Sequence, residues 1–92
     1  MKTKVLNYKV LVEKETQGDG KIVFVTQVPT LGVSDFGDTI EKALENTEKL
    51  IKFHVESLID EGSKIPGPDD PENMFVANQQ VEIKTDKKLV FA

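Results

Sequence analysis

The 92-residue chain contains no cysteine and only one histidine, His54, so it lacks most of the side chains used in catalysis and metal binding. Without cysteine it has no disulfide framework and no thiol chemistry. One histidine alone cannot build the usual zinc sites. The sequence also lacks an apolar run long enough to cross a bilayer, and no apolar signal core follows the basic start at residues 1–4. These absences predict a soluble, cytoplasmic protein without a metal or cofactor.

Positive charge is also scarce, because 12 basic residues stand against 16 acidic ones and give a net charge of −4. Phosphate binding draws on a positive surface, so this balance argues against nucleic acid as the main partner. It suits a basic protein partner, although a surface charged for solubility explains it equally well. The one basic cluster of note, Lys84, Lys87 and Lys88, is explained by a solvated strand end. We therefore predict no direct DNA binding.

Apolar residues in alternating positions predict strands, and a longer period predicts one helix. The strands are expected over about 6–14, 22–28, 33–36 and 80–85, and the helix over about 39–61. The strand at 22–28 is apolar on both faces, so both faces should be covered. The helix would cover one face, and a second subunit or a different protein the other. Residues 88–91 form either a short edge strand or an ordered tail. On this pattern alone the fold class is an α+β sandwich.

Individual residues mark where these elements begin and end. Asp38 is a suitable helix N-cap, and Glu41 would complete a capping box. Gly62 is expected just past the end of the helix. Pro29 would end the preceding strand, because proline has no ladder donor. Gly32 and Gly37 are expected in tight turns that need backbone freedom.

The order of these residues resembles the HicB-like antitoxin family, also designated UPF0150, in its N-terminal domain only. The matching positions are Pro29, Leu31, Gly32, Gly37, Asp38, Thr39, Ala43, Leu44, Asn46, Gly62, Ile65, Pro66 and Pro68. The sequence departs from the family pattern at Thr30 and Lys42, where carboxylates are usual, and it lacks the second proline of the turn. The resemblance spans Tyr8 to Ile83. It implies a truncated ribonuclease-H-like β-β-β-α-β fold, with one long helix packed on one face of a largely antiparallel sheet.

The resemblance also implies a function, which is to bind and occlude a small basic HicA-type toxin that cleaves mRNA. Such a protein would not be an enzyme. Family members that repress their operon carry a further C-terminal DNA-binding domain. The segment after Asn73 has no room for one, so residues 1–92 are expected to form a single domain. Asp35 and Phe36, on the short third strand and its turn, are the predicted toxin contacts.

Two other functions stay open. One is an orphan HicB-fold oligomer that serves as a structural or regulatory binding module without a toxin. The other is a metal-dependent nuclease, for which Asp35, Asp38 and Glu41 are the only clustered acids near the helix start, although two of them already have capping roles. His54 lies on the apolar stripe of the helix, where a hydrogen-bonded core histidine is the usual case.

Apolar residues outside the helix stripe favour self-association. Phe53 lies off the stripe, and Leu89, Val90 and Phe91 come late in the chain. Together with the doubly apolar strand they exceed what one helix can cover, and exposed apolar patches usually mark contacts. We therefore expect a homo-oligomer, either a dimer or a tetramer.

Overall fold

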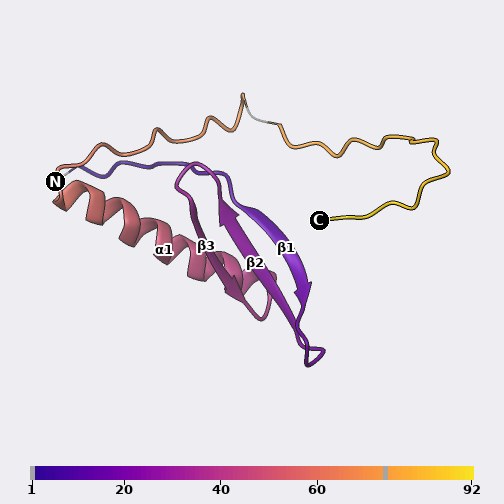
Figure 1. Ribbon diagram of the computed structural model, residues 1–92. Coiled ribbons are helices and arrows are strands. Elements are labelled where there is room, and N and C mark those ends of the chain that lie inside the picture. Colours follow the sequence, from indigo (N-terminus) through magenta and orange to yellow (C-terminus); the bar gives the residue numbers. More distant parts are fainter. Residues whose placement is uncertain (1, 74) are drawn as a thin grey trace.

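A computed structural model describes residues 2–73 and 75–92 of the chain. Its elements are the strands β1 (Leu11–Thr16), β2 (Ile22–Val28) and β3 (Val33–Gly37), followed by the helix α1 (Ile40–Asp60). The strands form an antiparallel sheet in the order β1-β2-β3, and α1 lies across one face of it (Figure 1). Three antiparallel strands followed by one long helix confirm the predicted α+β class.

The register of the sheet decides which side chains meet the helix. Thr26 of β2 stands opposite Val12 on β1 and Asp35 on β3, and Val25 stands opposite Glu13 and Phe36. The hydroxyl of Thr26 reaches Thr47 of α1, so Thr26 and the other even-numbered residues of β2 face the helix. Val23, Val25 and Gln27 therefore project from the opposite face, which we call the open face of the sheet.

The core lies between α1 and the end of the sheet where β2 turns into β3. Val28, Leu31 and Val55 form its buried centre, and Tyr8, Val10, Val33 and Ile51 pack around them. Two hydroxyl groups are also buried. Thr47 Oγ1 donates to the carbonyl of Ala43 at 2.7 Å and lies 2.5 Å from Thr26 Oγ1. This hydroxyl pair joins α1 to the middle strand at a point where neither group reaches water.

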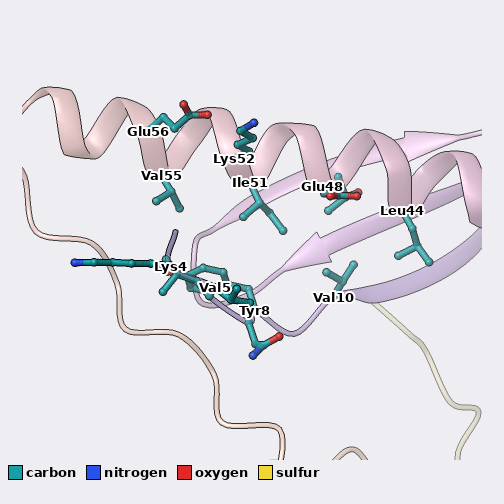
Figure 2. Close-up of a pocket in the computed structure, with 13 residues that line it drawn as sticks. Lys4, Val5, Tyr8, Val10, Leu44, Glu48, Ile51, Lys52, Val55 and Glu56 are labelled. Carbon is teal, nitrogen blue, oxygen red and sulfur yellow. The ribbon is translucent and has the colours of Figure 1, made fainter. Parts of the chain in front are cut away.

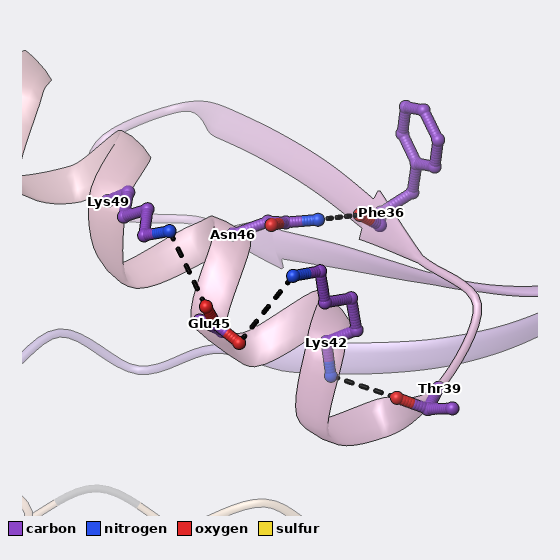
Figure 3. Close-up of polar contacts among 6 residues, drawn as sticks. All are labelled: Phe36, Thr39, Lys42, Glu45, Asn46 and Lys49. Atoms are coloured by element: carbon purple, nitrogen blue, oxygen red, sulfur yellow. Dashed lines mark hydrogen bonds and ion pairs between the residues drawn. The ribbon is translucent and has the colours of Figure 1, made fainter.

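The helix begins one residue later than the sequence predicted. Thr39, not Asp38, is the N-cap, and its Oγ1 accepts a hydrogen bond from the Lys42 N–H at 3.0 Å (Figure 3). The capping box was wrong as well, because the third helical position is Lys42 and not Glu41. Since β3 continues to Gly37, Asp38 serves as the connecting residue and lies 3.6 Å from the Lys21 ammonium. Glu41 remains in the first turn, where a carboxylate favours the helix dipole.

The helix ends in a Schellman motif at Gly62. The Gly62 N–H donates to the Ile59 carbonyl at 3.0 Å, and the Ser63 N–H donates to the Leu58 carbonyl at 2.9 Å. Gly62 has φ of 69°, a left-handed conformation that suits glycine.

The two predicted turn glycines have different roles. Gly32 has φ of 68° and lies in the turn after Pro29, where its N–H donates to the Val28 carbonyl at 2.8 Å. Gly37 does not have a positive φ and belongs to β3. A Cβ there would lie 2.5 Å from the backbone nitrogen of Ala43, so the reason predicted for Gly37 was wrong. Glycine is needed because the helix backbone approaches the strand closely.

The first strand is displaced from its predicted range of 6–14. β1 starts at Leu11, which pairs with Gln27, because β2 ends at Val28 and turns away. The segment before it pairs with the loop after the helix instead. There the Asp69 N–H donates to the Asn7 carbonyl at 2.8 Å, and the Tyr8 hydroxyl donates to the Pro66 carbonyl at 2.8 Å.

The predicted fourth strand at 80–85 is wrong for the described part of the chain, where these residues pair with no other strand. Residues 88–91 are not a strand either. The chain after residue 74 runs as an extended arm past the sheet and then turns back toward its C-terminal end (Figure 1). The radius of gyration is therefore 17.7 Å, against about 12 Å for a compact chain of this length. Alternating residues make a segment suitable for a strand, but a strand also needs a neighbour to pair with.

Candidate binding surfaces

The open face of the sheet carries a shallow hollow of about 320 Å³. Its lining residues come from β1, β2, β3 and the first hairpin: Glu15, Gln17, Val23, Val25, Ser34, Asp35 and Phe36. Phe36 is 62% exposed, although it stands directly opposite Val25 in the sheet. Both predicted contact residues, Asp35 and Phe36, therefore line the same hollow. An exposed aromatic ring beside aliphatic side chains is a feature common in protein interfaces.

Carboxylates surround this apolar centre. Glu15 lines the hollow and Glu13 stands opposite Val25 on the same face, whereas Asp35 lines the hollow from the position opposite Thr26, which faces the helix. The Asp35 carboxylate is fixed by its own backbone, because its Oδ1 accepts the Phe36 N–H at 2.8 Å. The hollow therefore combines an apolar floor with negative charge at its margin, an arrangement that complements a basic surface with an apolar contact.

Hydrogen bonds from the helix hold the strand that presents Phe36. The side-chain amide of Asn46 donates to the Phe36 carbonyl at 2.8 Å (Figure 3). Thr26 Oγ1 accepts the Asp35 N–H at 3.1 Å, so the middle strand fixes the preceding residue. Sequence reasoning did not assign these positioning roles. The sequence did contain a signal for these roles, because the polar residue Thr26 interrupts an apolar strand and the polar residue Thr47 interrupts the apolar stripe of the helix.

A second surface lies on the other side of the sheet, between the N-terminal segment and α1. We call it the helix groove; it has a volume of about 540 Å³ (Figure 2). Its apolar walls are Tyr8 and Val10 on one side and Leu44, Ile51 and Val55 on the other. Charged side chains from both walls, Lys4, Glu48, Lys52 and Glu56, also line it. The sequence did not predict this groove, because the N-terminal segment was expected to form a strand.

A carboxylate latch fixes the loop that leaves the helix. Asp69 Oδ2 accepts the Lys9 N–H at 2.7 Å, and Asp69 Oδ1 accepts the Thr30 hydroxyl at 2.8 Å. The Lys9 backbone N–H and then the Thr30 hydroxyl hold the pKa of Asp69 below its ordinary value of 3.8, with a smaller contribution from the Lys9 charge. The sequence placed Asp69 in a polar loop and gave it no role.

The residues considered for a nuclease do not form a metal site. Within residues 2–73 and 75–92, no cluster of three histidine or acidic side chains could hold an ion. Asp38 pairs with Lys21, and Asp35 binds its neighbouring backbone. His54 is half-buried on α1. Among the described residues, no helix is long and apolar enough to span a membrane.

The fold defines a small α+β protein with two candidate binding surfaces, the hollow on the open face and the helix groove. Residues 8–85 match the HicB-like antitoxin family of bacterial toxin–antitoxin systems, and the chain belongs to that family. It is 38% identical over 65 residues to a UPF0150 protein of Synechocystis sp., covering 71% of this chain and 78% of that protein.

A second relative is an uncharacterised 14.9 kDa protein from the rep–hol intergenic region of Haemophilus phage HP1. It is 34% identical over 59 residues, which cover 64% of this chain and 41% of the phage protein. No solved structure matches the chain significantly. The ribonuclease-H-like description of the fold therefore stays a prediction.

Proposed function

We propose that this protein is an antitoxin that binds a small basic toxin of HicA type and blocks its active site by stoichiometric occlusion, without turnover. Membership of the HicB-like family supports an antitoxin role. The structural observation that carries the proposal is the exposed Phe36 ring in an apolar hollow bordered by Glu15 and Asp35. This surface would receive an apolar contact and basic side chains of the toxin.

The two parts of the hollow would contribute differently to binding. Aromatic residues that become fully desolvated dominate binding energy, so Phe36 is the expected anchor. The carboxylates at the margin would attract a basic toxin and speed association more than they would slow dissociation. Asn46 and the Thr26–Thr47 pair would keep β3 in place, so that Phe36 needs little ordering when the toxin binds.

The experiment that tests this proposal is calorimetric titration of the chain with a small basic protein encoded beside its gene. We expect saturable, stoichiometric binding for the native chain. Phe36→Ala should weaken it roughly 30-fold or more, the equivalent of losing an anchor worth about 2 kcal/mol. Phe53→Ala is the matched control, because Phe53 is 71% exposed but lies on the helix, away from the hollow.

Charge reversal at Asp35 tests the carboxylate margin separately. Asp35→Lys should lower the association rate and weaken the salt dependence of binding. Unchanged affinity and rate would remove Asp35 from the contact surface. If Phe36→Ala also bound like the native chain, the open face would not be the toxin-binding surface.

A second candidate function is an oligomeric binding module without a toxin. The helix groove favours it, because none of the described residues fills that apolar surface, which lies on the opposite side of the sheet from Phe36. Absence of a toxin-like gene beside this one, together with self-association, would favour this function over the first.

A further inference from the structure

The open face of the sheet carries a row of three different side chains, one from each strand. Val25 of β2 stands opposite Glu13 on β1 and opposite Phe36 on β3. Adjacent strands lie about 4.8 Å apart, so the backbones of Glu13 and Phe36 are separated by roughly 10 Å across Val25. Glu15 projects from the same face two residues further along β1 and lines the hollow. The row therefore places carboxylates on one side of an aliphatic side chain and an aromatic ring on the other.

The Phe36 ring lies largely in solvent although its backbone is fixed at both ends. The ring projects away from α1, whereas the Phe36 carbonyl accepts the Asn46 amide at 2.8 Å (Figure 3). The Phe36 N–H donates to Asp35 Oδ1, also at 2.8 Å. The hollow that the ring helps to line has a volume of about 320 Å³. This is at the small end of ligand sites, which span about 300–1,000 Å³, so the hollow suits one side chain better than a helix or a strand.

The carboxylates of this row have no cation beside them within the part of the chain that the structure describes. None of the ion pairs there involves Glu13 or Glu15. Lys14, which lies between them on β1, stands opposite Phe24 and faces the helix side of the sheet. A purely apolar partner that covered the row would leave carboxylates without a countercharge, which is unfavourable. The partner's side chain at this point should therefore carry a positive charge.

Arginine has the chemistry that matches all members of the row. Its guanidinium group is planar, stacks on aromatic rings and forms paired hydrogen bonds with a carboxylate. Its methylene stem is apolar and can lie along an aliphatic surface. Over Val25, the stem would cover the valine and the guanidinium would stack on Phe36, with its N–H groups toward the carboxylates of β1. Lysine supplies the charge but neither the flat surface nor the fixed set of donors.

We propose that the hollow on the open face recognises an arginine side chain of its protein partner, held between the Phe36 ring and the carboxylates of Glu13 and Glu15. The inference rests on the proposed function, because it names the basic side chain that the toxin would place in this hollow. It gives Phe36 a role in selecting arginine over lysine, in addition to its role as an apolar anchor.

Nuclear magnetic resonance titration of the full chain tests the proposal without any toxin present. The probes are N-acetyl-arginine amide and N-acetyl-lysine amide, which carry the same charge. The arginine probe should shift the backbone signals of Val25 and Phe36 in a saturable manner, with an apparent affinity roughly threefold or more above that of the lysine probe. Equal shifts from both probes, or no shift from either, would overturn the proposal.

Two variants separate the contribution of the ring from that of the charge. Phe36→Leu keeps an apolar side chain at this exposed position and should abolish the preference for arginine, because leucine has no aromatic face. Glu13→Gln/Glu15→Gln keeps the shape of both side chains but removes their charge, and it should weaken the binding of both probes. Phe53→Leu is the matched control, because it changes an exposed aromatic residue on the helix, and it should keep the preference. A Phe36→Leu chain that still prefers arginine would overturn the proposal.

The probe titration and the toxin titration can fail separately. A chain that binds the small basic protein but does not prefer the arginine probe would keep the antitoxin function and overturn the arginine site. A chain that prefers the arginine probe through Phe36 but does not bind that protein would support the arginine site and contradict the proposed function.

Discussion

Substitution of Gly37 by alanine should severely weaken the fold, because the helix backbone occupies the space of the new methyl group. A Cβ at residue 37 would lie 2.5 Å from Ala43 N, 2.9 Å from Ala43 Cα and 2.9 Å from Lys42 C. All three are backbone atoms, so no side chain can turn aside. Ordinary contact requires α1 to move by roughly 1 Å, and overpacking of this kind costs about 1–3 kcal/mol.

The movement would also disturb the bonds that hold β3. Asn46 donates to the Phe36 carbonyl at 2.8 Å, and the Thr26 and Thr47 hydroxyl oxygens lie 2.5 Å apart. A helix shift of this size would lengthen or break both contacts. A further loss of roughly 1 kcal/mol brings the expected destabilisation to about 2–4 kcal/mol. A chain of this size has a total stability on the order of 5–14 kcal/mol, so Gly37→Ala removes a large share of it.

Urea denaturation followed by circular dichroism measures this effect. The midpoint for Gly37→Ala should fall, with the slope unchanged. Gly18→Ala is the matched control, because nothing lies within 4 Å of a Cβ there and its φ is not positive. It should be neutral or slightly stabilising. If Gly37→Ala lowered the free energy of unfolding by less than about 0.5 kcal/mol, the close approach of α1 to β3 would be wrong.

Two further predictions concern buried and latched polar groups. The Thr47 hydroxyl donates to the Ala43 carbonyl and lies 2.5 Å from the Thr26 hydroxyl, which also donates to the Asp35 carbonyl at 3.1 Å. Each Thr→Val change should therefore cost about 1–3 kcal/mol in urea denaturation. The double variant should cost less than the sum, and strict additivity would show that the hydroxyls do not interact. Because the pKa of Asp69 is lowered in the folded chain, its latch stabilises the fold at pH values above 3.8, the ordinary pKa of the carboxyl group. This stabilisation is lost as the pH falls through the lower pKa of the folded state. Melting temperatures measured from about pH 2 to about pH 6 should therefore fall less steeply on acidification for Asp69→Asn than for the native chain. Asp86→Asn is the control and should behave like the native chain. Equal pH profiles for Asp69→Asn and the native chain would exclude the latch.

The sequence predicted the elements that depend on local rules. The apolar stripe of α1 is a periodic pattern that one buried face imposes, and β2 is a short run that is apolar on both faces; the helix and the strand follow these patterns closely. Gly62 was placed correctly because few residues other than glycine adopt its left-handed backbone at low cost. The antitoxin family was also predicted, from an ordered set of turn and cap residues spread over most of the chain.

What the sequence could not predict depends on contacts between distant residues. The need for Gly37 comes from Ala43 across a packed interface, which a turn rule does not describe. The capping role moved from Asp38 to Thr39 because β3 extends to Gly37 before the helix starts. The segment at 80–85 has the pattern of a strand, but pattern alone cannot supply the ladder partner that makes one.

The same difference between local patterns and contacts of distant residues applies to the surface residues. Asp35 and Phe36 are consecutive on β3 and both line the hollow, although their register partners, Thr26 and Val25, face opposite sides of the sheet. Asp69 was missed because its partners, Lys9 and Thr30, lie about 60 and 39 positions away in the chain. Such a latch has no local signature beyond a carboxylate in a loop.

The central claim, that this chain is an antitoxin, is tested most directly by titrating it into an RNA-cleavage assay of the small basic protein encoded beside its gene. The account predicts that cleavage falls linearly with added chain and stops at a fixed stoichiometric ratio, and that much more Phe36→Ala is needed than Phe53→Ala. Cleavage that continues unchanged at a large excess of the native chain would contradict the antitoxin function.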